Sequence, residues 1–180
     1  MGPLLPMRLL LDGRRVSVRE ILPEDKEALH AAFSGLSAQS RFTRFMATMR
    51  DLSEPMLEAA THPVPDREFA LVAVADEGEG EKIVGGARYA STAGHDSCEF
   101  AITVVDGWQG VGLAPRLMTT LMEAARSHGF RVMEGFVLAG NQSMRKLAKR
   151  LGFNDLADPD DATVRVVRCN LQGGHADATR

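Results

Sequence analysis

The residues with the clearest chemical potential are two glycines, Gly110 and Gly112, and a carboxylate, Glu99, on the segment before them. The glycines follow a β-branched apolar run at 100–105 and precede a stretch from Leu113 onward in which apolar residues recur at helical spacing. A helix that begins in such a loop directs unpaired backbone N–H groups and the positive end of its dipole toward the loop. The order strand, glycine loop, helix therefore predicts a site for a phosphate or a pyrophosphate.

Two common nucleotide motifs are absent around this loop. No GxxxxGK[ST] occurs, so the loop lacks the lysine and hydroxyl of a nucleotide-hydrolysing P-loop. The glycines at positions 107, 110 and 112 do not have GxGxxG spacing, and no acidic residue follows at the distance usual for binding ribose. The ligand is therefore expected to be a different phosphate compound; the alternative is that the loop is only a tight turn of an ordinary α/β protein.

The composition indicates one globular domain. The chain has 180 residues, of which 44% are hydrophobic, which is enough for one good core but short for two independent domains. A formal net charge of −3 gives no general attraction to nucleic acid or to an anionic membrane. Cys98 and Cys169 lie far apart, with no histidine at ligand spacing, so neither a disulfide framework nor a metal site is expected. A cytoplasmic location fits these features best.

The N-terminal third predicts one strand and three helices. Apolar and polar residues alternate over Arg14–Glu20, which indicates a half-exposed strand. Helices are expected after Pro23, over Ser37–Arg50, and from Ser53 to near His62. The second helix carries an apolar stripe that either packs in the core or lines a substrate site, formed by Phe42, Phe45, Met46 and Met49.

From Phe69 the pattern changes to strands. Three runs joined by short turns predict an antiparallel meander: Phe69–Ala75, Lys82–Ser91 and Ser97–Val105. The segments expected after it are a helix over Gly112–His128, a strand over Arg131–Leu138, a helix from Asn141 to Gly152, and a strand over Thr163–Asn170. We therefore predict an α/β (α+β) domain over residues 14–170 with a mixed, mostly antiparallel sheet. Residues 1–13 are expected to form a ragged extension and residues 171–180 a flexible tail.

Two segments carry a resemblance to a known family. Gln109–Ala114 resembles the Q/R-x-x-G-x-G/A pyrophosphate loop of the GNAT superfamily, the acetyl-CoA-dependent N-acetyltransferases. The family's second signature, N-x-x-A-x-x-L-Y-x-K-x-G-F, resembles the segment from Asn141 to Phe153, where Leu147, Arg150 and Gly152 also fit. The order of elements from residue 16 to 170 is similar to the GNAT fold. Shorter matches look like the acetyltransferase domain of bacterial protein lysine acetyltransferases: Arg19 with Pro23-Glu24-Asp25, Gln39–Phe42, Asp66–Ala73, Cys98–Ala101 and Asp106–Gly110.

The resemblance implies acetyl-CoA as co-substrate and a splayed pair of central strands that leaves a cleft for its pantetheine arm. It assigns backbone groups of Ile102, Thr103 and Val104 to that arm, with one of them polarising the thioester carbonyl. It assigns the pyrophosphate to the loop residues Gln109, Gly110, Val111, Gly112, Leu113 and Ala114. Asn141 is expected either to contact the pantetheine or simply to cap its helix.

The expected reaction needs a base. An amine attacks a thioester as the free base, whereas lysine-type amines with a pKa of about 10.4 are almost fully protonated at neutral pH. Glu99 is the first candidate, because it lies on the strand that leads into the glycine loop and the family often uses a glutamate there. Glu68, at the start of another strand, is the second; both could instead be ordinary exposed carboxylates. Cys98 is expected to be a small buried hydrophobe rather than an acyl-carrying nucleophile.

One departure from the family pattern leaves two functions open. Ala148 stands where many members carry a tyrosine that acts as general acid. The first function is an N-acetyltransferase in which an acceptor amine, from a protein lysine or a small molecule, attacks acetyl-CoA directly in a ternary complex. The second is a non-catalytic acyl-CoA-binding regulatory module. The sequence leaves open the identity of the acceptor and whether the protein is a homodimer.

Overall fold

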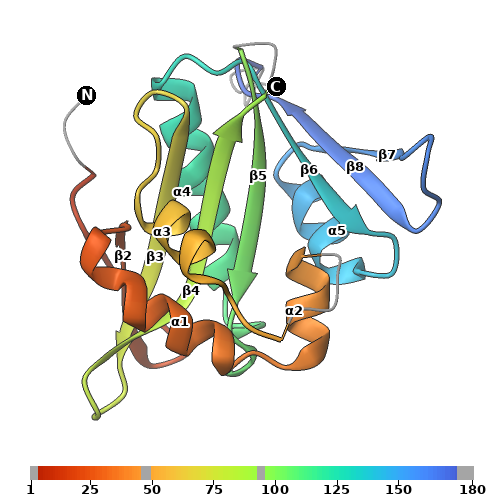
Figure 1. Cartoon of the computed structure of the whole chain (residues 1–180). Helices are drawn as coiled ribbons and strands as arrows, with labels where there is room; N and C mark the ends of the chain where they lie inside the picture. The colour runs from red at the N-terminus through yellow and green to blue at the C-terminus, as the bar shows by residue number, and fades with distance from the viewer. Residues whose placement is uncertain (1–3, 46–49, 93–95, 174–180) are drawn as a thin grey trace.

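The computed structural model describes residues 4–45, 50–92 and 96–173, which form a sheet with helices on both faces (Figure 1). The strands are β1 (Met7–Leu11), β2 (Arg14–Glu20), β3 (Glu68–Asp76), β4 (Glu81–Ser91), β5 (Ser97–Val104), β6 (Val132–Leu138), β7 (Asn154–Ala157) and β8 (Val164–Asn170). The helices are α1 (Lys26–Ser34), α2 (Ala38–Phe45), α3 (Glu54–Thr61), α4 (Leu113–Ser127) and α5 (Gln142–Arg150), with 3-10 turns η1 (Pro23–Asp25) and η2 (Asp106–Trp108).

The strands lie in the order β1-β2-β3-β4-β5-β6-β8-β7. Every neighbouring pair is antiparallel except β5 and β6, which are joined through α4 and run parallel. This parallel pair follows from the helical connection, because a crossover returns the chain to the sheet in the same direction. The predicted α/β class, with a mixed and mostly antiparallel sheet, is confirmed.

Two apolar cores hold the helices against the sheet. On one face, buried residues of α4 such as Leu117 and Leu121 pack with buried strand residues such as Leu71 and Phe100, and α5 joins the same core. On the other face, α1 packs against the buried side chains Val72, Val74 and Ile83. Alternate residues of a strand point to opposite faces, so β3 and β4 supply residues to both cores. The nearly continuous apolar run of β3 is explained by its helices on both sides.

The central pair of strands separates soon after it begins. β5 and β6 are paired only over Ser97–Glu99 and Val132–Glu134, although β5 continues to Val104 and β6 to Leu138. Beyond Glu99, β5 keeps its pairing with β4, and β6 keeps its pairing with β8. The predicted splay is therefore confirmed, and Glu99 lies where it opens. The splay does not coincide with the register shift recorded between β3 and β4, which lies between Ala73 and Val74 of β3.

The termini of the domain differ from the prediction. Residues 7–11, expected to belong to a ragged extension, form β1, which pairs with β2 because Leu9 and Leu11 pack against the main core. Leu171, expected in the flexible tail, is buried, and its N–H donates to the carbonyl of Arg131. The short strand β7 was not predicted. Met46, Met49 and residues 174–180 lie outside the described residues.

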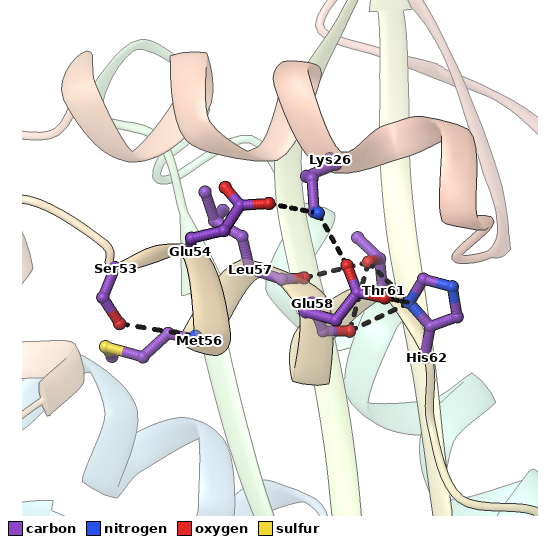
Figure 2. Close-up of polar contacts among 8 residues, drawn as sticks. All are labelled: Lys26, Ser53, Glu54, Met56, Leu57, Glu58, Thr61 and His62. Carbon is purple, nitrogen blue, oxygen red and sulfur yellow. Dashed lines mark hydrogen bonds and ion pairs between the residues drawn. The ribbon is translucent and has the colours of Figure 1, made fainter.

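An ion-pair network fastens α3 to α1 (Figure 2). Lys26, at the start of α1, donates to Glu54 at 2.5 Å and lies 2.6 Å from a carboxylate oxygen of Glu58, both on α3. Ser53 caps α3 by accepting from the N–H of Met56, as its position before Glu54-Pro55 predicts. These contacts hold α3 against α1 on the same face of the sheet.

Candidate active site

A row of charged side chains crosses one face of the sheet at the point where β5 and β6 separate. Glu68 of β3 is opposite Ala90 of β4, Ala90 is opposite Glu99, and Glu99 is opposite Glu134 of β6. Directly opposed residues of neighbouring strands share a face, so Glu68, Glu99 and Glu134 project to the same side. The sequence prediction named Glu68 and Glu99 but missed Glu134, whose signal was a lone carboxylate in an apolar strand.

The surroundings of Glu99 raise the pKa of its carboxyl group above the usual value for a glutamate. Its side chain is exposed at the fork, but the surrounding protein removes part of its hydration and this raises its pKa. The neighbouring charge of Glu134 raises the pKa further, whereas the cation of Arg44 on α2 lowers it. The carboxylate therefore holds a proton more readily than an ordinary glutamate, which suits a group that must accept one.

Glu68 is in a different environment. One of its oxygens accepts from the N–H of Val64 at 3.0 Å, and the other lies 3.4 Å from a guanidinium nitrogen of Arg88 on β4. These two contacts give Glu68 a structural function, since it fixes both the turn before β3 and the guanidinium of Arg88. Glu99 thus remains the stronger candidate for the base.

A cavity of about 320 Å³ lies on the same face, between the sheet and α1–α3. Its wall includes Ala101 and Thr103, which follow Glu99 on the same face of β5 at alternate positions, so the cavity leads along β5 toward the fork. Apolar side chains of α1 and α3, such as Leu29, Phe33, Met56 and Ala60, form much of the remaining wall. An acceptor whose amine reaches Glu99 can place the rest of its structure here.

Arg44 and Arg88 are the charged side chains among the described residues that line this cavity. Burial lowers the pKa of Arg44 to about 10, and the like charge of Arg88 acts in the same direction, while Glu99 opposes it. The sequence analysis did not select either arginine. Charged residues within a helix and a half-exposed strand are common, and only the packing of α2 against the sheet brings the two arginines to one cavity.

Alternate residues of β5 direct their backbone groups toward the gap between β5 and β6. Val105 N–H donates to Val84, and Thr92 N–H donates to Ser97, so odd-numbered residues of β5 direct their N–H and C=O groups toward β4. Ile102 and Val104 therefore direct theirs toward the gap, as expected. The expectation fails for the backbone of Thr103, which faces β4, while its side chain lines the cavity.

The glycine loop after β5 has the predicted form. Gly110 and Gly112 have φ values of 76° and 94°, a left-handed conformation that a side chain disfavours, and Gly112 is the N-cap of α4. Leu113 is buried in the core and anchors the start of the helix. The N–H groups of the first turn of α4 are thus held in place next to the loop, and Gly112 has no Cβ to obstruct a ligand. This arrangement fits a pyrophosphate.

Gln109 braces the loop through its side chain. Its amide nitrogen donates to the carbonyl of Val104 at 3.0 Å and lies 3.4 Å from a carboxylate oxygen of Asp106. The Val104 carbonyl, predicted for the pantetheine, therefore already has a partner. Trp108 is buried, donates to Glu77 at 3.0 Å, and carries the guanidinium of Arg14 over its ring at 3.9 Å. These contacts stiffen the loop before any ligand binds.

Asn141 caps α5. Its side-chain oxygen accepts from the N–H of Met144 at 3.2 Å, which is the second of the two roles considered for it. Capping uses only the oxygen of the amide, so the nitrogen retains its capacity to donate.

Neither a tyrosine acid nor a cysteine nucleophile is available at the fork. Ala148 is buried in the core, and the single tyrosine of the sequence, Tyr89, is buried with its hydroxyl 2.5 Å from Nδ1 of His128. Cys98 is fully buried, and burial, reinforced by the charge of Glu134, raises the pKa of its thiol to about 12. A thiol with this pKa is not ionised at neutral pH, so it is a poor nucleophile.

Two further properties concern the described residues as a whole. Within residues 4–45, 50–92 and 96–173, no group of three or more histidine, cysteine, aspartate or glutamate side chains is arranged to hold a metal ion. No helix in these parts of the chain has both the length and the apolar character needed to cross a bilayer.

Comparisons with known proteins agree with this geometry. A family model described as the acetyltransferase (GNAT) family matches residues 31–153. Acetyltransferase PA5475 of Pseudomonas aeruginosa is 36% identical over 160 residues, which cover 89% of this chain and 86% of that protein. Acetyltransferase Pat of Mycolicibacterium smegmatis is 31% identical over 145 residues, 78% of this chain but only 41% of the relative. The crystal structure of the GNAT domain of S. lividans PAT has a TM-score of 0.81 at 26% identity and covers 92% of this chain and 96% of that domain.

A sheet forked between β5 and β6, with a glycine loop that leads from β5 into a helix and a carboxylate at the fork, is the arrangement of a CoA-dependent acyltransferase. More particularly, the chain belongs to the GNAT acetyltransferase family and is an acetyl-CoA-dependent acetyltransferase. The family and the names of its relatives favour the enzyme over the non-catalytic acyl-CoA-binding module.

Proposed function

We propose that this enzyme transfers the acetyl group of acetyl-CoA to a primary amine by direct attack in a ternary complex, with Glu99 as the base. The acceptor class is a protein lysine or a small amine. The observation that carries the proposal is the position of Glu99, the last paired residue of β5 before the strands separate. From there its carboxylate accepts the proton of an incoming amine, directly or through one water.

The glycine loop and β5 would hold the co-substrate. Acetyl-CoA supplies a thioester that is already activated toward amines. Backbone N–H groups of residues 110–114 bind its pyrophosphate, helped by the positive end of α4, and the N–H and C=O groups of Ile102 meet the pantetheine in the gap. Asn141 retains an amide N–H with which to donate to the same arm. One backbone donor of the gap polarises the thioester carbonyl.

The departing thiolate needs little help from a protein acid. A thiol pKa of roughly 8.5 makes thiolate a good leaving group, so the protein can operate without a tyrosine at position 148. The proton that Glu99 receives can return to the product side through water at the exposed fork. We therefore expect loss of the base to cost much more activity than the absence of an acid.

Initial-rate kinetics test the proposal. Release of CoA is measured with a panel of small amines and lysine peptides while acetyl-CoA and acceptor are varied together. A ternary complex gives double-reciprocal lines that intersect, whereas an acyl-enzyme on Cys98 gives parallel lines. Parallel lines, or loss of activity in a folded Cys98→Ala variant, would reject direct attack.

A further inference from the structure

The floor of the cavity is formed by strand residues on the same face of the sheet as Glu99. Glu99 lies in a row of directly opposed residues with Ala90 and Glu68. The next two rows on this face line the cavity; they are Ala101, Arg88 and Ala70, and then Thr103, Gly86 and Val72. Successive rows on one face are two residues apart, which is roughly 6.6 Å along a strand. The cavity therefore begins one row beyond Glu99 and extends away from it.

Gly86 lowers the floor at its centre. Its φ is not in the left-handed region, so the backbone does not require a glycine at this position. A Cβ added to Gly86 would have one atom of the described residues within 4 Å, the carbonyl oxygen of Leu71 at 3.1 Å. The neighbouring Gly85 differs, because its Cβ would meet the side chains of Leu113 at 3.2 Å and Leu117 at 3.4 Å. No described side chain packs on Gly86 in this way, so its surface is available to a ligand in the cavity.

The wall opposite this floor is mainly apolar. It is formed by side chains of α1 and α3, among them Leu29, Ala32, Met56 and Ala60. Two arginines also belong to the lining, and Arg88 lies in the row next to Glu99, 3.4 Å from a carboxylate oxygen of Glu68. No aspartate or glutamate is among the described lining residues. A cationic group carried into this cavity would lose hydration and meet no carboxylate in the described wall, whereas an apolar group would gain from burial.

We propose that the acceptor is a small primary amine whose nitrogen is joined through a short chain to an apolar group, either an alkyl chain or an aromatic ring. This deepens, and rests on, the proposed function. The nitrogen, at Glu99, bonds to the acetyl carbon, the bond from that carbon to sulfur breaks, and the proton passes to Glu99. The chain then passes Ala101, and the apolar group lies over Gly86. An apolar cavity of about 150 Å³ accommodates a benzene ring, so about 320 Å³ holds a ring with a short chain.

The same geometry disfavours two other kinds of amine. A polyamine carries a second ammonium group, which would be dehydrated in the cavity. A protein lysine can reach Glu99 from the exposed side of the fork, but its side chain continues into a main chain that cannot enter a cavity of about 320 Å³. Its reaction would leave the apolar walls without contact. Selection thus comes from burial of an apolar group and from the cost of burying a second charge.

Matched substrates provide the test. With saturating acetyl-CoA, CoA release is measured for ethylamine, butylamine, hexylamine, 2-phenylethylamine, 1,6-diaminohexane and a lysine peptide, and rates are expressed per concentration of free amino group. We expect kcat/KM to rise roughly fourfold for each added methylene that enters the cavity. Hexylamine should exceed 1,6-diaminohexane by about tenfold or more, because the two differ in whether the far end of the same chain is apolar or charged. Hexylamine and 2-phenylethylamine should both exceed the lysine peptide.

Variants assign the preference to the cavity. Gly86→Val adds a side chain to the floor and Ala101→Leu enlarges one in the row next to Glu99, so each should reduce the ratio of hexylamine to ethylamine kcat/KM several-fold. The matched control is Ala157→Leu, on the exposed strand β7, which should leave this ratio unchanged. Unchanged acetyl-CoA affinity by calorimetry shows that each variant is folded. If one does not fold, the other variant and the wild-type series still decide the proposal.

The outcomes separate this inference from the proposed function. A flat chain-length series, equal or better use of 1,6-diaminohexane or of the lysine peptide, or an unchanged ratio in both folded cavity variants would overturn the inference and leave the acetyltransferase proposal intact. Faster reaction with hexanoyl-CoA than with acetyl-CoA, lost in Gly86→Val, would assign the cavity to the acyl chain and also overturn it. Binding of hexylamine and of ethylamine to the protein with CoA is measured by calorimetry, so the apolar preference is decided even without turnover. Acetyl-CoA binding with no turnover of any amine would instead count against the proposed function.

Discussion

Replacing Glu99 by glutamine should remove the base and leave the shape of the site unchanged. A positioned base contributes about 10²–10⁴-fold to such a step, so kcat/KM at pH 7 should fall by about this factor. Acetyl-CoA affinity should stay nearly the same, because the side chain of Glu99 projects to the cavity face whereas the proposed cofactor contacts come from the loop and from the backbone of β5. The fall should be in kcat/KM for the amine, with calorimetry confirming that acetyl-CoA still binds.

The pH profile makes this prediction quantitative. For a lysine-type amine with a pKa of about 10.4, the free fraction rises roughly tenfold per pH unit below the pKa, so raising the pH from 7 to 9 should restore roughly 100-fold of the activity of Glu99→Gln. Wild-type activity should fall on the acid side as Glu99 becomes protonated. Because desolvation and Glu134 raise the pKa of Glu99, this fall should begin above the usual range for a glutamate.

A variant of the neighbouring carboxylate, Glu134, should shift the pH profile without removing the base. Glu134→Gln removes a like charge from the side of Glu99, so the pKa of Glu99 should decrease and the acid limb of the profile should move to lower pH. Activity at pH 7 should be nearly unchanged. A Glu99→Gln variant with wild-type rates from pH 6 to 9, or a Glu134→Gln profile that does not move, would refute this account of the base. Glu68 or a water would then be the next candidate.

Two glycines test the cofactor loop and the core. Gly112→Glu should weaken acetyl-CoA binding more than tenfold by calorimetry, because it places an anion at the proposed pyrophosphate position. The control is Gly129→Glu at the far end of α4, where φ is a similar 88°; it should leave acetyl-CoA affinity unchanged. Equal losses of affinity in the two variants would contradict the assignment of the loop. Gly135→Ala should lower the unfolding free energy by about 1–3 kcal/mol, because the added Cβ would lie 2.4 Å from the ring of Phe100. The control is Gly140→Ala, whose Cβ would meet no atom within 4 Å. Equal denaturant midpoints for the two variants would reject the packing argument.

The sequence was sufficient to predict a strand or a helix where the local pattern had a single physical explanation. The alternating and continuous apolar runs predicted the meander of β3, β4 and β5, and Gly112 followed by a helical apolar pattern predicted the start of α4. Both depend on residues that are neighbours in the chain. The short strand β7 was missed because the four residues Asn154–Ala157 carry little apolar pattern and owe their conformation to pairing with β8.

The site was less predictable because it is assembled across strands. Glu99 could be selected from its place before the glycine loop, but the effect of Glu134 on it depends on the exact register between β5 and β6. Arg44 and Arg88 come from a helix and a strand that are far apart in the chain. Much of the apolar wall of the cavity that they line comes from α1 and α3, which the sequence predicted only as helices.

One acidic residue connects the two halves of the site. Asp106, in the turn before the glycine loop, accepts from the hydroxyl of Ser40 at 2.5 Å and from the N–H of Ser37 at 3.3 Å. The first turn of α2 is therefore tied to the turn that carries the loop, and the same helix bears Arg44 farther along. Because the acceptor in both hydrogen bonds is a carboxylate, a ligand that shifts the loop must also shift α2 or break these charge-assisted contacts. The position of Arg44 is thus linked, through α2 and Asp106, to the turn that carries the glycine loop.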